Sequence, residues 1–349
     1  MFIPKFTITN SITQSLTQIE RFRGFLHAVN LSETWLALMQ KKALILEAYH
    51  TTHIEGTQLS LDQAKQILDD KTIYNADKED TQELLNYRTA FEFVSSYLLD
   101  QKPINEGLMR QIHAILVQNV RGNSAMPGEY RKVQNFVVNS QTKKIIYTPP
   151  PAYDVPIMMK ELIEWVNNEK AIHPVIISAI AQFQFVHIHP FLDGNGRTAR
   201  LLSTLYLYKT GYDFKKLFTI SEYYDRNRLK YYEAIQSVRD SNYDMTLWLE
   251  YFCTGLTMQL AELYNDTENK IKFDLLSTEK KLSSNQKKAI ELGLNGAFTL
   301  KDFMKICPNV SKRTLQRDLL YLQKLQLIEA EGNTTNRIYH LKLTAPHIP

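Results

Sequence analysis

The chain has 349 residues, of which 44% are hydrophobic and 22% charged, with only 12 Gly, 12 Pro and 2 Cys. This composition excludes a collagen-like, disordered or disulfide-stabilised protein, and the length predicts about two globular domains. The formal net charge of +4 does not by itself indicate a nucleic-acid-binding protein, but residues 279–349 carry 12 Lys and Arg against 6 Asp and Glu.

Neither a signal peptide nor a membrane span is predicted. The N-terminal segment MFIPKFTITNSITQSL has no basic stretch followed by an apolar one, and no apolar run reaches the roughly 18 residues that a transmembrane helix needs. Cys253 and Cys307 lie far apart and predict no disulfide framework or cysteine-rich zinc site. We therefore expect a cytoplasmic protein without a membrane partner.

The first 270 residues are predicted to be mostly helical, because apolar residues recur along them at steps of three and four. One helix is predicted to begin after Ser32, and Ser60 with Gln63 forms a capping-box pattern at the start of another. Further helices are expected at Asp80–Leu99, Glu106–Asn119, Val155–Asn168, Pro174–Val186, Arg197–Lys209, Asp225–Asp240 and Met245–Lys270.

One segment departs from the helical pattern. Val133–Tyr147 is rich in Val, Ile, Phe and Tyr, has Asn-Ser-Gln-Thr near its middle and is followed by a threonine and three prolines. This pattern predicts a single β-hairpin. Farther along, the polar and charged stretch Asp266–Ser284 predicts a linker into a second unit.

The C-terminal unit resembles a winged helix-turn-helix. Three short helices are expected at Asn285–Leu294, Leu300–Ile306 and Ser311–Leu325, followed by a hairpin over Leu327–Leu343 with its turn at Glu331–Asn333. On the third helix, three leucines would face inward and four polar residues outward, where a recognition helix meets DNA. The inward residues are Leu315, Leu319 and Leu322, and the outward ones are Lys312, Arg313, Gln316 and Arg317. The alternative is a module for protein docking or dimerisation.

The segment HPFLDGNGRTAR, residues 189–200, is the most informative for chemistry. Its two glycines lead directly into an apolar helix, an arrangement that predicts an anion site made of free N–H groups at the positive end of the helix. Arg197 and Arg200 would add charge-assisted contacts to phosphate. Asp193 beside an anion indicates a divalent cation between them, for which Mg²⁺ is the natural choice. His189 could accept a proton near neutral pH.

Three other interpretations of this segment exist. Gly194–Ala199 also fits the dinucleotide fingerprint G-x-G-x-x-A, with Asp213 near the expected ribose-binding offset, but the chain lacks alternating strands and helices. His187 and His189 could ligate a metal, although the sequence indicates no third ligand. The segment could also be an ordinary helix start with a structural turn.

The same segment resembles the Fic family signature H-P-F-x-D/E-G-N-G-R-x-x-R at every fixed position. The flanks are also similar to the family, which has a Pro-Gly-x-Tyr-Arg segment, here Pro127–Arg131, and then a hairpin called the flap, here Val133–Pro151. The resemblance covers roughly residues 1–260. It implies a helical core and an enzyme that uses Mg²⁺ to move AMP from ATP onto a Ser, Thr or Tyr hydroxyl of a target protein.

The resemblance also implies roles for individual residues. His189 would be the general base, and Asp193 would bind the metal that bridges the α- and β-phosphates. Phe191 would pack to hold the loop. The phosphate contacts are assigned to a nest at Gly194, Asn195 and Gly196, to Arg197 for the β-phosphate and to Arg200 for the γ-phosphate. Tyr231 and Tyr232 fit the aromatic stretch that helps to hold the adenine, and plain packing is the alternative for both.

A second match lies upstream, where Thr51-Thr-His-Ile-Glu55-Gly56 resembles the family's inhibitory motif S/T-x-x-x-E-G/N. The resemblance implies that Glu55 pairs with Arg200 and prevents ATP from binding productively. The alternative is a solvated glutamate at a helix end.

We therefore expect a mainly α-helical protein with an inhibitory helical region over residues 1–100, a Fic core with its hairpin flap over 101–270 and a winged helix over 283–345. The expected function is an autoinhibited protein adenylyltransferase. The alternatives are a hydrolase that removes AMP from proteins and a DNA-binding regulator whose core senses nucleotide. The expected partners are ATP and a target protein, with DNA and a second copy of the chain as further candidates.

Overall fold

The computed structural model describes residues 2–71, 73, 76–99, 102–120, 125–138, 142, 144–294, 296–332 and 337–342. The chain divides into two compact units, Met1–Ala261 and Glu262–Pro349. The fold is mainly helical with a short antiparallel strand pair in the first unit, as predicted. None of the helices in these described ranges has both the length and the apolar character needed to cross a membrane.

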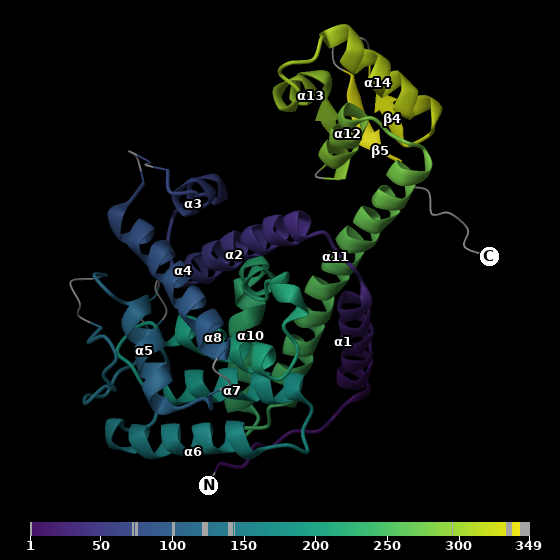
Figure 1. Cartoon of the computed structure of the whole chain (residues 1–349). Helices are drawn as coiled ribbons and strands as arrows, with labels where there is room; N and C mark the ends of the chain where they lie inside the picture. The colour runs from purple at the N-terminus through teal and green to yellow at the C-terminus, as the bar shows by residue number, and fades with distance from the viewer. Residues whose placement is uncertain are drawn as a thin grey trace. The chain divides into compact units, whose positions relative to one another are not determined.

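The first unit is built almost entirely of helices (Figure 1). Its elements are α1 (Asn10–Ala28), α2 (Glu33–Glu55), α3 (Leu61–Leu68), α4 (Lys78–Leu99), α5 (Glu106–Leu116), β1 (Val137–Val138), β2 (Ile145–Tyr147), η2 (Ala152–Asp154), α6 (Val155–Asn168), α7 (Pro174–Ile188), α8 (Asn195–Lys209), η3 (Phe214–Lys216), α9 (Ser221–Arg226), α10 (Arg228–Asp240) and the first part of α11 (Thr246–Glu279).

Helices α7 and α8 form the centre of this unit. Nearly every residue of α7 is buried, which is the pattern of a helix that is surrounded by others on all sides. Helix α8 packs along α7, while α2, α4 and α5 contact α8 and α6 contacts α7. The six-residue loop between the two central helices, residues 189–194, is therefore held at both ends by helices that are almost fully buried.

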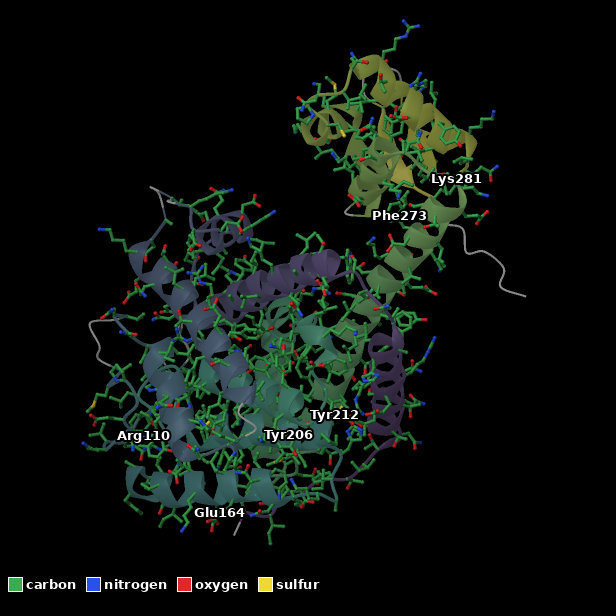
Figure 2. All side chains as sticks on the ribbon, viewed as in Figure 1. Arg110, Glu164, Tyr206, Tyr212, Phe273 and Lys281 are labelled. Atoms are coloured by element: carbon green, nitrogen blue, oxygen red, sulfur yellow. The ribbon has the colours of Figure 1, made fainter. Side chains whose placement is uncertain are left out.

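The outer helices are amphipathic. Helix α6 buries Leu162 and Ile163 and exposes Glu164, which points away from the unit in Figure 2. On the central helix α8, by contrast, Tyr206 is only 4% exposed.

The two predicted helix caps are confirmed. Ser32 caps α2, and Ser60 with Gln63 forms a capping box on α3.

Several boundaries differ from the predicted ones. Helix α5 ends at Leu116 rather than Asn119, and α7 continues to Ile188. The helix expected over Asp225–Asp240 is two helices, because Asn227 leaves helical geometry and caps the second one by accepting a hydrogen bond from the Lys230 N–H. Helix α1 and strand β3 (Phe298–Thr299) were not predicted.

The linker expected over Asp266–Ser284 is helical along most of its length. Helix α11 continues to Glu279. Two ion pairs with i,i+4 spacing, Lys272 with Glu268 and Lys270 with Asp274, support the helix, although the segment is polar. Phe273 is 2% exposed within the core of the second unit (Figure 2).

The second unit contains α12 (Ser284–Leu294), β3, α13 (Leu300–Ile306), α14 (Lys312–Lys324), β4 (Ile328–Glu331) and β5 (Ile338–Leu341). The strands form one antiparallel sheet in the order β3-β5-β4. The three helices and the hairpin follow the predicted order. Leu315, Leu319 and Leu322 are fully buried on α14, as expected.

Some predictions fall on residues outside the described ranges. They are the middle of the flap at 139–141, Asn333 in the predicted wing turn, and the end of the C-terminal unit from residue 343 onward.

Candidate active site

The loop between α7 and α8 ends at a helix start whose first N–H groups have no side-chain cap. Helix α8 begins at Asn195, and its N-cap is Gly194, which has a φ of 73° and no side chain to cap the first turn. A Cβ at Gly194 would lie 2.8 Å from Cγ1 of Val117, so glycine is required by space as well as by φ. The uncapped N–H groups and the helix dipole together favour an anion at this place.

His189 begins the loop in a left-handed conformation, with a φ of 52°. This conformation costs roughly 1–2 kcal/mol for a residue other than glycine, and such strain is typical of functional sites. The Nδ1 atom lies 3.3 Å from the carbonyl oxygen of Val186, so Nδ1–H donates to it and Nε2 carries the lone pair. Burial, with a smaller effect from Arg131, lowers the pKa of His189 to about 4. The imidazole is therefore neutral at pH 7 and can accept a proton.

The loop is closed by a reciprocal pair of hydrogen bonds. The Asn195 side-chain oxygen accepts from the Phe191 N–H at 2.9 Å, and its amide nitrogen donates to the Phe191 carbonyl at 2.8 Å. Phe191 is fully buried, which confirms the packing role predicted for it. In this structure the Asn195 side chain shapes the loop, and only its backbone remains for the predicted anion nest.

His113 supports the loop from α5 and was not found by sequence reasoning. Its ring stacks on Phe191 at a centroid distance of 3.6 Å. Its Nδ1 accepts from the Gly128 N–H, and its Nε2–H donates to the Asp193 carbonyl, both at 3.0 Å. Burial lowers its pKa to about 4, so the neutral form is present at pH 7. A histidine in an apolar helix stripe gives no sequence signal beyond that of a core residue.

Asp193 and Arg197 lie next to each other at the start of α8. Arg197 is 1% exposed, and its Nη1 donates to Glu83 Oε2 of α4 at 2.7 Å. Its Nη2 lies 3.9 Å from Asp193 Oδ1, and neither Nε nor Nη2 has a hydrogen-bond partner among the described residues. Two buried donors without hydrogen bonds destabilise the folded state unless a ligand accepts from them. These two donors therefore support an anion beside Asp193. Glu83 was not identified from the sequence.

The implied Mg²⁺ fits this arrangement through one carboxylate. Asp193 is 30% exposed and would face a phosphate held by Arg197, and Mg²⁺ is commonly held by one or two carboxylates, phosphates and water. Within the described residues there is no group of three His, Cys, Asp or Glu that could hold a metal ion by protein ligands alone.

His187, which the sequence offered as a metal ligand together with His189, has a structural partner in Tyr147. The Tyr147 hydroxyl donates to the His187 carbonyl and lies 2.7 Å from His187 Nδ1.

Arg200 is paired with the predicted motif on α2. Its Nη2 donates to Glu55 Oε1 at 2.6 Å and to the Thr51 carbonyl at 3.0 Å, and its Nε donates to Thr51 Oγ1 at 2.7 Å. Arg200 is 1% exposed, and the pKa of Arg200 is raised mainly by Glu55 against the opposing effect of burial. The Glu55 carboxylate also lies where a Cβ at Gly196 would be. Glu55 therefore covers the start of α8.

Tyr231 and Tyr232 lie in different environments. Tyr231 is 2% exposed, stacks on Tyr224 at 4.4 Å and contributes to the raised pKa of Arg200. Tyr232 is 50% exposed. The ring of Tyr231 is therefore enclosed by protein, whereas Tyr232 retains a surface that a base could contact.

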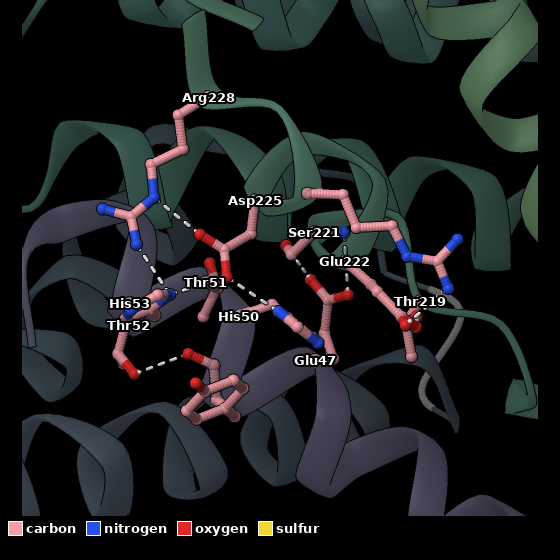
Figure 3. A network of polar contacts seen from close by, with 12 residues as sticks. Glu47, His50, Thr51, Thr52, His53, Thr219, Ser221, Glu222, Asp225 and Arg228 are labelled. Atoms are coloured by element: carbon pink, nitrogen blue, oxygen red, sulfur yellow. Dashed lines mark hydrogen bonds and ion pairs between the residues drawn. The ribbon is translucent and has the colours of Figure 1, made fainter. Parts of the chain in front are cut away.

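Hydrogen bonds and ion pairs connect helix α2 to α9 and α10 (Figure 3). This polar network was not predicted from the sequence. Asp225 Oδ2 lies 2.8 Å from His50 Nδ1 and 2.7 Å from His53 Nδ1, and Asp225 Oδ1 accepts from Arg228 Nε at 2.6 Å. One turn earlier on α2, the buried Glu47 carboxylate accepts from the Ser221 N–H and hydroxyl. These contacts hold the helix that carries Glu55.

Comparison with known proteins identifies a family for the part of the chain that contains this loop. Residues 103–207, which include the whole loop, match the model of the Fic/DOC family, so this part of the chain is a Fic/DOC domain. The "Protein adenylyltransferase Fic" of Culex quinquefasciatus is 30% identical over 261 residues, which cover 72% of this chain and 49% of that protein. The protein of the same name from Drosophila ananassae is 30% identical over 212 residues, covering 58% and 41%. The chain thus spans about half the length of these relatives or less.

Solved structures share the fold. A Fic family protein from Desulfovibrio desulfuricans G20 superposes with a TM-score of 0.66 at 23% identity, covering 99% of this chain and all of that one. Fic-1 (aa134–508) from C. elegans gives a TM-score of 0.63 at 24% identity, covering 74% and 73%. At 23% and 24% sequence identity, these two comparisons show that the chain shares the fold of those proteins.

Proposed function

We propose that the chain is a protein adenylyltransferase that transfers AMP from ATP to a Ser, Thr or Tyr hydroxyl of a protein. The observation that carries the proposal is the neutral imidazole of His189, with Nε2 as its basic atom, in the loop that leads to an uncapped helix start with two arginines. The curated relatives named protein adenylyltransferase support the same reaction.

The proposed reaction assigns a role to each residue of the site. His189 Nε2 accepts the proton of the target hydroxyl, whose oxygen forms a bond to the α-phosphorus while the bond between the α-phosphorus and its bridging oxygen breaks. Pyrophosphate leaves, and the backbone N–H groups of residues 195 and 196, with Nε and Nη2 of Arg197, stabilise the phosphate charge, whereas the Gly194 N–H donates to Asp193 Oδ1 at 2.7 Å. Mg²⁺ at Asp193 would neutralise phosphate charge.

Glu55 restrains this activity in the proposed enzyme. It occupies the Arg200 donor that would otherwise bind the terminal phosphate, and it lies against Gly196 in the anion site. ATP can then bind productively only when the Glu55 carboxylate moves. A charged hydrogen bond of this kind contributes about 1.5–3 kcal/mol.

The test is label transfer by a purified Glu55→Gly variant mixed with cell proteins. Label on the α-phosphate of ATP should appear on protein, label on the γ-phosphate should not, and mass spectrometry should find AMP on a hydroxyl residue. Loss of AMP from a previously modified protein, without any gain, would instead indicate the hydrolase. No transfer in either direction would refute both activities.

DNA binding by the second unit is a second candidate function. Lys312, Arg313, Gln316 and Arg317 are all exposed on the N-terminal half of α14, the placement expected of a recognition helix in a winged helix-turn-helix. The test is binding of the full chain to duplex DNA at low salt. Absence of binding would favour a docking or dimerisation module.

A further inference from the structure

The end of α7 and the start of the active-site loop are bonded to the flap region at five consecutive main-chain carbonyls. The carbonyl oxygens of residues 187–191 accept hydrogen bonds from groups within residues 131–147. The donors, in order, are Tyr147 hydroxyl, Arg131 Nη2, Arg131 Nε, Arg131 N–H and the Asn135 amide, at 3.0, 3.3, 2.8, 2.9 and 3.0 Å. The last carbonyls of a helix lack partners within the helix, and here the flap region supplies them.

Arg131 provides three of these five donors. Its guanidinium also donates to the carbonyls of Val133 and Pro150, which lie at the two ends of the flap. Arg131 is 2% exposed, and its guanidinium donates to four carbonyl oxygens of the described residues. One buried cation therefore joins the two ends of the flap to the last turn of α7.

This placement is electrostatically suited to a cation, because the C-terminal end of a helix carries partial negative charge. It also bears directly on the general base. Arg131 Nε donates to the carbonyl of His189, the residue with a φ of 52°, so it holds the backbone of that residue in its uncommon conformation. Since Nδ1 of His189 bonds to Val186, the direction of Nε2 follows from this backbone conformation.

We propose that Arg131 is a positioning residue of the active site, which fixes the direction of His189 Nε2 and couples the position of the flap to it. The inference rests on the proposed function, because it assigns Arg131 a part in the transfer reaction. Arg131 does not itself contact ATP in this proposal, so its removal should impair the chemical step more than nucleotide binding.

The pKa of His189 tests the charge of Arg131 separately from its hydrogen bonds. The charged groups that act on His189 are Arg131 and Arg239, which lower its pKa, and Glu55, which raises it. Arg131→Met removes one of the two positive charges and should therefore raise the pKa of His189. Arg131→Lys keeps the charge but cannot reproduce the fork of hydrogen bonds, so it should leave the pKa near its original value.

The experiment compares Arg131→Lys and Arg131→Met, each in the Glu55→Gly background. Both should lower kcat by about 10–100-fold, as expected for a displaced base, while KM for ATP changes by less than about threefold. The pKa of His189 is measured by NMR of histidine-labelled protein. Arg110→Met is the matched control, because Arg110 Nε also donates to a nearby carbonyl, that of Gly128, without contacting residues 187–191. It should leave kcat and the His189 pKa unchanged.

Two results would overturn the proposal. One is an unchanged kcat in Arg131→Lys, which decides the question even if Arg131→Met does not fold. The other is a fall in activity that comes entirely from KM for ATP. If the Glu55→Gly parent transfers no AMP, the proposed function fails and the titration decides alone: a His189 pKa in folded Arg131→Met that equals the pKa in the Glu55→Gly parent contradicts the role of Arg131.

Discussion

Glu55 and Arg200 are 145 residues apart in the sequence, yet a hydrogen bond of 2.6 Å joins the carboxylate of one to the guanidinium of the other. The acid is the last residue of α2, and the arginine lies in the second turn of α8. The bond connects the helix with the inhibitory motif to the helix that begins the anion site. The first prediction follows from it.

Glu55→Gly should raise AMP transfer to protein by roughly 10–150-fold. This range follows from a charged hydrogen bond of about 1.5–3 kcal/mol at about 1.4 kcal/mol for each factor of ten. The measurement is the initial rate of label transfer from α-labelled ATP. The control is Glu279→Gly, which removes an exposed glutamate from the last residue of α11.

The double variant Glu55→Gly with Arg200→Ala should lose this gain, because the released arginine is the group that would orient the terminal phosphate. If Glu55→Gly leaves the rate unchanged while Arg200→Ala abolishes it, Arg200 keeps its role and the inhibition by Glu55 is refuted.

His189→Ala, in the Glu55→Gly background, should lower the transfer rate by about 10²–10⁴-fold, the usual cost of losing a general base. ATP affinity, measured by calorimetry, should change little, because His189 is assigned no phosphate contact. The matched control is His27→Ala, at an exposed position on α1. Retained turnover in His189→Ala would contradict the assignment of the base.

The pH profile of transfer should have its acidic limb near pH 4. The pKa of His189 is lowered to about 4 by burial, so the basic form is present above that pH and is lost as the pH falls through it. The rate should therefore remain nearly constant from about pH 8 to pH 5.5, whereas an unperturbed histidine would lose activity near pH 6.5. Because Glu55 raises this pKa, the limb should lie slightly lower in Glu55→Gly. A midpoint near 6.5 would refute the prediction.

Glu83→Gln should destabilise the first unit by about 3–5 kcal/mol, because it removes the carboxylate 2.7 Å from the buried Arg197 and leaves the longer ion pair with Asp193, at 3.9 Å. All three tryptophans of the chain, Trp35, Trp165 and Trp248, lie in this unit, so denaturant unfolding followed by their fluorescence measures its stability. Glu129→Gln breaks an exposed pair with Lys132 and should cost less than about 1 kcal/mol. Equal effects of the two changes would contradict the assignment.

Neutralising Lys312, Arg313 and Arg317 together should lower the slope of log K against log salt for duplex DNA by about 3, roughly one unit for each phosphate contact. The measurement is a salt titration of binding by the full chain. The control neutralises three exposed lysines elsewhere in the second unit, Lys280, Lys287 and Lys288, and should leave the slope nearly unchanged. Equal losses in both triple variants would indicate nonspecific charge rather than contacts from α14.

Local patterns in the sequence determined much of this protein. The helical periodicity, the caps at Ser32 and Ser60, the inward leucines of α14 and the loop signature all depend on neighbouring residues, and the structure confirms the elements they predict. The predictions were less accurate where a local signal was weak or was outweighed by composition. The Asn227 side chain caps α10 and divides the expected helix, and two i,i+4 ion pairs support the polar helix through Lys270 and Phe273.

The tertiary structure alone revealed which groups hold the site in place. Glu83, His113 and Arg131 come from α4, α5 and the segment before the flap, and each meets the loop or the start of α8 from more than 50 residues away in the sequence. A buried histidine or arginine acquires its role from the carbonyls and carboxylates that packing brings to it, and these partners follow no sequence spacing. The sequence therefore determined the candidate reactive groups, whereas only the packing of the helices decided their protonation, direction and partners.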